Sequence, residues 1–198
     1  MSYDPNQHHR RSIRLKGYDY SQDGLYFNTI CVQHKECLFG QIIDHQMVLN
    51  DAGKMVEKWV GELKNKYPDI DFGEYVVMPN HFHCIIETVT RNDGSGRVVE
   101  KGGHGDRDKQ PQRTSDKYGP DNQQFNATIG RMLDWFKTMS TNDYIRGVKT
   151  FNWQRFDSKL WQRNYWEHII RDQQSYENIS GYIVDNPAKW KDDQFYSE

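Results

Sequence analysis

Two closely spaced histidines are the residues of this chain whose types and spacing most directly suggest chemistry. His81 and His83 flank a single residue, Phe82. Because strand side chains alternate between the two faces of a sheet, both imidazoles would project from one polar side. Neutral imidazoles bind metal ions, but strand histidines also serve structural roles. The pair therefore predicts half of a metal site or a structural histidine pair, and it needs further groups to become catalytic.

Tyr182 and Asn186 are the groups that could complete such a site. They stand four residues apart, which places them on one face of a helix. With two imidazoles and one amide oxygen as ligands, a divalent ion keeps open positions for phosphate oxygens and water. The chemistry that suits this set is transesterification of a nucleic-acid phosphodiester, in which the tyrosine oxygen attacks phosphorus and leaves a covalent phosphotyrosine.

The strands that must carry the histidines follow from hydrophobic patterning. Residues 72–78 and 79–86 are rich in β-branched and aromatic residues and are separated by Met78-Pro79-Asn80, which predicts adjacent strands. A buried strand is predicted at 25–32 and a short one at 165–172. A hairpin is predicted at 38–49, with its turn at Asp44-His45.

Three helices are predicted around these strands. The first is capped by Asn50 or Asp51 and ends near Tyr67, before Pro68. The second begins at 125 or 126 and ends near 140–142, and the segment 144–163 is expected to be irregular. The third runs from about 172 to 186, because Pro187 disfavours helical geometry at the preceding residue. This order predicts an α+β fold, an antiparallel sheet with helices on one face and both histidines on the exposed face.

Composition bounds the organisation of the chain. Its 198 residues favour one domain. The predicted parts are a flexible basic arm over 1–24 and a single domain over 25–198, interrupted by a disordered, glycine-rich and charged insert at 90–124. The three cysteines have no disulfide or zinc-site spacing. The sequence shows no apolar signal region and no stretch of apolar residues long enough to span a membrane, so a cytoplasmic protein is expected.

Basic residues must act locally if the protein binds nucleic acid, because the formal net charge is −2 at pH 7. The cationic arm near the start is either solvated or tracks phosphates. Interleaved cations and aromatics around 153–163 suit a single-stranded nucleic-acid groove or a core. His168 is either a contact to DNA or a structural histidine. The candidate DNA contacts are Arg10, Arg11, Arg14, Lys16, Arg155, Lys159, Arg163 and His168.

Four segments in the same order resemble a known superfamily. Residues 75–83, with the sequence Tyr-Val-Val-Met-Pro-Asn-His-Phe-His, resemble the HUH motif (histidine, hydrophobic, histidine) of the IS200-like transposases. Residues 161–172 and 181–189 resemble its REP-associated tyrosine transposase branch, and 14–20 match the usual opening of that branch. The resemblance covers nearly the whole chain outside 90–124.

The resemblance implies a ferredoxin-like fold and a metal-dependent endonuclease of single-stranded or hairpin DNA that rejoins strands through a 5′-phosphotyrosine. By this resemblance His81 and His83 match the pair that binds Mg²⁺ or Mn²⁺, and Tyr182 matches the nucleophile. Asn186 stands where the IS200 enzymes carry Gln, which keeps an amide oxygen but shortens its reach. Both a homodimer, with the tyrosine acting in trans, and a monomer acting in cis are compatible with the resemblance.

Two other function classes stay open at this point. A catalytically silent, ferredoxin-like nucleic-acid-binding protein would keep the fold without the chemistry. A histidine-triad-type nucleotide hydrolase also alternates histidines with hydrophobic residues, but it needs a third histidine where Ile85 stands. That replacement counts against the hydrolase.

Overall fold

The computed structural model describes residues 23–89 and 127–197. Two predicted segments lie outside the described residues. They are the insert at 90–124 and the basic arm with Arg10, Arg11, Arg14 and Lys16, of which only residues 23 and 24 are described. Within the described residues, no helix is both long and apolar enough to cross a membrane.

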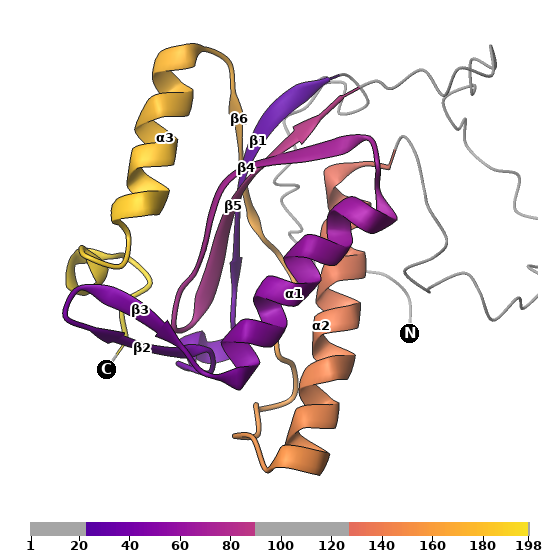
Figure 1. Ribbon diagram of the computed structural model, residues 1–198, viewed down its shortest axis with the longest axis vertical. Helices are drawn as coiled ribbons and strands as arrows, with labels where there is room; N and C mark the ends of the chain where they lie inside the picture. The colour runs from indigo at the N-terminus through magenta and orange to yellow at the C-terminus, as the bar shows by residue number, and fades with distance from the viewer. Residues whose placement is uncertain (1–22, 90–126, 198) are drawn as a thin grey trace, which may run out of the picture.

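A four-stranded antiparallel sheet forms the centre of the fold (Figure 1). Its strands are β1 (Gly24–Cys31), β4 (Ile70–Val77), β5 (His81–Thr88) and β6 (Trp166–Ile170). The remaining elements are the hairpin β2 (Gly40–Ile43) and β3 (Gln46–Leu49), the helices α1 (Asp51–Lys66), α2 (Ile129–Phe151) and α3 (Gln173–Asp185), and two 3-10 turns at Gln33–Lys35 and Trp190–Asp192.

The sheet has the strand order β4-β5-β1-β6, and its elements follow one another as β1-α1-β4-β5-α2-β6. This is the β-α-β-β-α-β arrangement of ferredoxin-like folds, with the β2–β3 hairpin inserted before α1. The fold class predicted from the sequence is therefore confirmed. The predicted hairpin, the short strand β6 and the boundaries of α1 and α3 also agree with the structure within one or two residues at most ends.

Helices α1 and α2 lie on one side of the sheet, as predicted, and α3 lies on the other (Figure 1). Alternation along the strands sorts the side chains between these layers. Toward α3, Ile85 and Ile170 pack with Ile183 in a small separate core. The larger core lies under α1 and α2 and includes, from the sheet, Tyr26, Ile30, Phe82, Cys84 and Ile86.

Helix α2 is longer than its sequence predicts. It was expected to end near 140–142, yet it continues to Phe151 and ends at Asn152, which has a left-handed φ of 56°. Thr138 and Ser140 interrupt the apolar pattern, but their hydroxyls donate to main-chain oxygens one turn earlier, at 2.8 and 2.6 Å. The helix therefore continues, and Tyr144 extends its buried face.

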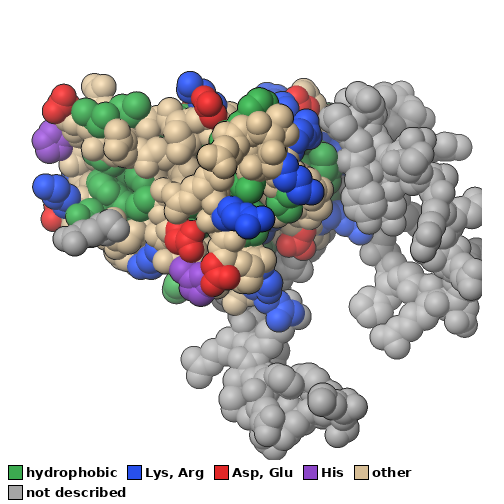
Figure 2. Space-filling model, turned by 90° about the horizontal axis from the view of Figure 1, so that it is seen from below, with side chains coloured by type: hydrophobic (Ala, Val, Ile, Leu, Met, Phe, Trp, Pro, Cys, Tyr) green, Lys and Arg blue, Asp and Glu red, His purple; other side chains and the backbone are tan. Residues whose placement is uncertain are grey.

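Charged side chains of both signs are mixed on the face of the molecule that Figure 2 shows. In the view of Figure 2, Lys and Arg side chains lie singly or in small groups between acidic and hydrophobic ones. This distribution agrees with a net charge near zero and shows no broad basic band on that face of the described residues.

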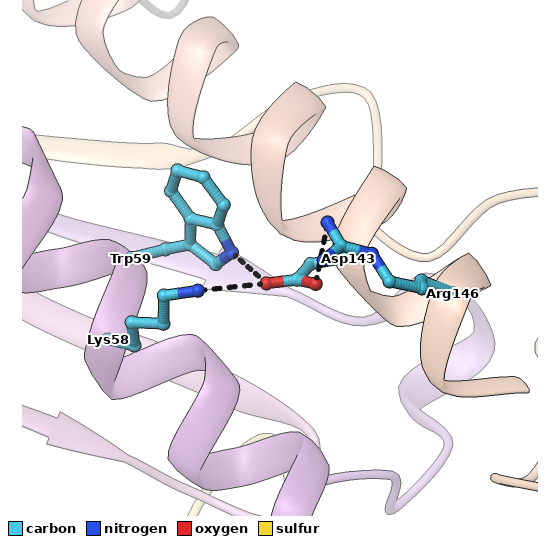
Figure 3. Close-up of polar contacts among 4 residues, drawn as sticks. All are labelled: Lys58, Trp59, Asp143 and Arg146. Atoms are coloured by element: carbon cyan, nitrogen blue, oxygen red, sulfur yellow. Dashed lines mark hydrogen bonds and ion pairs between the residues drawn. The ribbon is translucent and has the colours of Figure 1, made fainter. Parts of the chain in front are cut away.

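Asp143 ties α1 to α2 (Figure 3). Its carboxylate accepts a 3.0 Å hydrogen bond from the Trp59 indole and pairs with Lys58 at 3.4 Å and Arg146 at 3.2 Å. The side chain of Asp143 is only 13% exposed, so these partners compensate a charge that is largely removed from water. This contact lies in the part of α2 that the sequence did not predict to be helical.

We expect Asp143→Ala to lower the free energy of unfolding by about 1.5–3 kcal/mol, because the buried indole N–H loses a charged acceptor. Asp51→Ala is a suitable control. It removes a carboxylate from an exposed pair with Lys54 and should cost no more than about 1 kcal/mol. Urea unfolding followed by circular dichroism measures both changes, and equal losses would contradict the role given to Asp143.

Candidate active site

The two histidines project from β5 into a common space. The Nε2 atoms of His81 and His83 are 3.0 Å apart. The other ring nitrogen of each histidine is held by an oxygen: His81 Nδ1 donates to Asn80 Oδ1 at 2.8 Å, and His83 Nδ1 lies 2.7 Å from Thr29 Oγ1. Such contacts fix the orientation of metal-binding imidazoles. Both Nε2 atoms are therefore aimed at the same point.

Both histidines are buried, which corrects the expectation of an exposed histidine pair. Alternation places them on the predicted face, opposite α1 and α2, but the residues after α3 cover that face. The rings of Trp190 and Phe195 lie 5.9 and 4.8 Å from the ring of His81. Sequence patterning could not show this, because the covering residues follow β5 by more than a hundred positions and carry no periodic signal.

Burial keeps both imidazoles neutral. It lowers the pKa of His81 to about 3, with a smaller contribution from Lys35. Burial also lowers the pKa of His83 well below its usual value, and the neighbouring His81 acts in the same direction. A neutral imidazole has a free lone pair and is the form that binds metal ions. At neutral pH both imidazoles are thus in the uncharged form that is able to bind a metal ion.

Tyr182 reaches the histidines from α3. Its hydroxyl lies 3.3 Å from His83 Nε2 and donates to Asp193 Oδ2 at 3.1 Å. The side chain is 39% exposed, so its hydroxyl is anchored while part of the ring faces solvent. Burial and then the Asp193 carboxylate raise the pKa of Tyr182 to about 12. The phenol is therefore protonated at neutral pH and needs help to act as a nucleophile.

Asn186 is buried at the end of α3 and faces the same carboxylate. Its Nδ2 donates to Asp193 Oδ2 at 2.9 Å. Its Oδ1, the atom predicted from the sequence as a metal ligand, has no hydrogen-bond partner among the described residues. The structure thus brings Asn186 next to Tyr182 and leaves its oxygen available, and its role as a ligand stays a prediction.

Asp193 is the site residue that the sequence did not reveal. One carboxylate oxygen of Asp193 and one nitrogen each of His81 and His83 lie within 4.8 Å of one another. Its Oδ1 accepts a 2.6 Å hydrogen bond from the main chain of Phe195, which fixes the carboxylate. The only signal in the sequence is a pair of aspartates shortly after the last helix, and solvated surfaces carry many such pairs.

These residues fit a divalent metal ion. Two ligand atoms at right angles around an octahedral ion, each about 2.1 Å away, are about 3 Å apart, which agrees with the 3.0 Å between the imidazole nitrogens. Imidazole and carboxylate ligands together accept several divalent ions, Mn²⁺ among them.

A pocket of about 530 Å³ opens beside this centre, and His83, Tyr182 and Asp193 line it. Of the predicted DNA contacts, His168 also lines the pocket. The other described candidates are exposed but do not line it; they are Arg155, Lys159 and Arg163.

Comparison with known proteins identifies relatives in Haemophilus influenzae. No protein-family model matches the chain. An uncharacterised protein is 40% identical over 198 residues, which cover 98% of this chain and 97% of the relative. A protein described as a REP-associated tyrosine transposase is 38% identical over 174 residues, which cover 86% of this chain and 74% of the relative.

Two solved structures are more distant. A REP-associated tyrosine transposase bound to a REP hairpin has 19% identity and a TM-score of 0.48, over 84% of this chain and 68% of its own. A Deinococcus radiodurans protein described as a transposase has 11% identity and a TM-score of 0.42, over 87% of this chain and 95% of its own. Since both scores are below 0.5, the fold assignment rests on the strand order described above.

The identity and coverage of the second Haemophilus relative place this chain among the transposases. More narrowly, it belongs to the family of REP-associated tyrosine transposases. The family resemblance drawn from the sequence motifs is therefore confirmed.

The Thr29 contact generates a test of the metal site. We expect Thr29→Val to weaken Mn²⁺ binding about 10- to 100-fold, because His83 loses the hydroxyl that orients its ring. His83→Ala should weaken it further. Thr138→Val, a matched change on α2 away from the histidines, should leave Mn²⁺ affinity unchanged. Isothermal titration calorimetry with MnCl₂ measures all three, and unchanged affinity in Thr29→Val would contradict the orienting role.

Proposed function

We propose that this protein is a metal-dependent endonuclease and strand transferase of single-stranded or hairpin DNA that forms a covalent 5′-phosphotyrosine on Tyr182. The observation that carries the proposal is the 3.3 Å approach of the Tyr182 hydroxyl to Nε2 of His83, beside the converging imidazole pair. Membership in a transposase family supports DNA as the substrate. Together they favour an active enzyme over a silent nucleic-acid-binding protein.

In the proposed cleavage the Tyr182 oxygen attacks the scissile phosphorus while the bond from phosphorus to the 3′ oxygen breaks. The products are a 5′-phosphotyrosine and a free 3′-hydroxyl. Asp193 Oδ2 accepts the hydrogen bond of the phenol at 3.1 Å and so holds its oxygen beside the histidines. The phenolic proton leaves to water, because Tyr182 lines an open pocket and is 39% exposed. The leaving 3′ oxygen takes up one proton, which keeps the reaction balanced. Attack by a 3′-hydroxyl on the phosphotyrosine reverses these steps and rejoins DNA.

A divalent ion, Mg²⁺ or Mn²⁺, would be held by His81 and His83 and would polarise the phosphate and stabilise its developing charge. Asn186 and Asp193 are the two candidates for a third ligand. We favour Asp193, because its carboxylate carries a negative charge and an oxygen of it already lies within 4.8 Å of the imidazole nitrogens. Asn186 then orients this carboxylate through its 2.9 Å hydrogen bond.

The nucleophile and the histidines come from one chain. The approach of Tyr182 to His83 within the same molecule supports cleavage in cis. A monomer therefore suffices for the proposed chemistry, and a homodimer is not needed to complete the site.

We expect Tyr182→Phe to abolish covalent adduct formation, a loss of at least about 10³-fold. The assay incubates the protein with Mn²⁺ and a 3′-labelled hairpin oligonucleotide with single-stranded flanks, followed by a denaturing gel. Tyr176→Phe removes a hydroxyl from the same helix and should keep normal adduct levels. An adduct in Tyr182→Phe would rule out this nucleophile. If the wild-type protein binds such DNA but forms no adduct, the silent binding protein is the better description.

The third ligand is tested by comparing two variants. We expect Asp193→Asn to weaken Mn²⁺ binding by roughly 10- to 100-fold, because the site loses the negative charge of this candidate ligand, and Asn186→Ala to weaken it less. Calorimetry with MnCl₂ gives both affinities, and the wild-type protein with MgCl₂ gives the preference between the ions. A larger loss in Asn186→Ala would assign the third ligand to the amide oxygen instead.

A further inference from the structure

Trp166 stands apart from the other tryptophans of the chain. Of the six tryptophans, Trp59, Trp135, Trp161 and Trp190 are buried, and Trp153 is partly buried. Trp166 is 68% exposed. A large aromatic side chain in water forgoes the stabilisation that burial provides. Exposure alone is common on protein surfaces, but Trp166 also lines the pocket that contains Tyr182.

The register of the sheet places Trp166 in one row with the histidine pair. His83 on β5 is the register partner of Thr29 on β1, and Thr29 is the register partner of Trp166 on β6. Residues paired in this way project from the same face. Because neighbouring strands are about 4.8 Å apart, Trp166 lies about 10 Å along this row from His83. The next row toward the middle of β6 is made in the same way by Ile85, Phe27 and His168.

These rows form the floor of the pocket that holds the candidate nucleophile. The pocket is lined by Phe27, Thr29, His83, Trp166, His168 and Tyr182, together with Glu167 and residues 192–194. At one end the Tyr182 ring meets the Phe27 ring edge-on at 6.1 Å, and the hydroxyl points to His83. At the other end, β6 is the edge strand of the sheet, and its exposed indole borders the opening.

We propose that Trp166, with His168 beside it, is a stacking platform for one unpaired nucleobase adjacent to the scissile phosphate. This inference rests on the proposed function, because it takes the strand cut by Tyr182 as the occupant. A phosphate at the histidine end and a base at the indole end fit the pocket's layout, in which polar ligand atoms and an aromatic surface are about 10 Å apart. Stacking tolerates every base, because each has a π face. Trp166 therefore positions the strand rather than selecting its sequence.

A binding assay tests the platform without relying on cleavage. The probe is a fluorescein-labelled 12-nucleotide oligothymidine, measured by fluorescence anisotropy in EDTA with the full-length protein. We expect Trp166→Ala to raise Kd roughly tenfold, within the range for loss of one base stacked on an aromatic ring. Trp166→Phe should stay within about threefold of the wild-type protein, because a smaller aromatic ring preserves stacking.

Phe151→Ala is the matched control. Phe151 is also 68% exposed, but it lies at the end of α2 and does not line the pocket. Its truncation should leave Kd unchanged. Equal Kd values for Trp166→Ala and the wild-type protein, or equal increases for the two alanine variants, would overturn the proposal. Thermal unfolding of each variant verifies folding, and the exposure of both side chains makes large losses of stability unexpected.

Photocrosslinking locates the base directly. Oligothymidines carrying a single 5-iodouracil at successive positions are irradiated with the protein, and the crosslinked peptide is identified by mass spectrometry. We expect the crosslink at Trp166, and a crosslink found only at other aromatic residues would overturn the platform. The two proposals fail separately. Loss of affinity in Trp166→Ala without any Tyr182 adduct in the wild-type protein rejects the nuclease alone, whereas a normal adduct with unchanged affinity rejects the platform alone.

Discussion

The antiparallel pairing of β5 with β1 is the constraint on which the candidate site depends. It runs from Cys31 opposite His81 to Gly24 opposite Thr88 and sets Thr29 against His83. A slip of one residue would turn both imidazoles toward α1 and α2 and send Phe82 to the opposite face. The large core beneath these helices prevents such a slip, because Phe82 and Cys84 are fully buried in it. The hydrophobic layer thereby determines where the imidazole nitrogens point.

The electrostatics of the site follow from its burial. The histidines are neutral and Tyr182 stays protonated, because charged forms of these groups would lose hydration among Phe27, Trp190 and Phe195. Asp193 is the acidic residue within reach of all three groups. A divalent cation and a phosphodiester would bring opposite charges into this space together. Most of the charge in an occupied site would thus come from the cation and the phosphodiester rather than from the histidines and the tyrosine.

Local signals in the sequence predict most of the framework. Asn50, one of the two predicted caps, accepts a main-chain hydrogen bond at the start of α1, and Pro187 follows the end of α3 as expected. Alternation in β5 correctly separates His81 and His83 from Phe82. The full length of α2 was missed, because Thr138 and Ser140 satisfy their hydroxyls inside the helix in a way that composition does not reveal. The burial of the histidines and the approach of Asp193 depend on packing between distant segments, which no local pattern encodes.

The site is assembled from segments that are far apart in the chain. Tyr182 and His83 are separated by 99 positions, although their side-chain atoms approach to 3.3 Å. During synthesis the ribosome therefore exposes both histidines long before α3 exists. A nascent chain that pairs β5 with β1 would already orient the imidazoles, but it lacks Tyr182 until α3 emerges. The candidate site is consequently completed late in translation, after both histidines have left the ribosome.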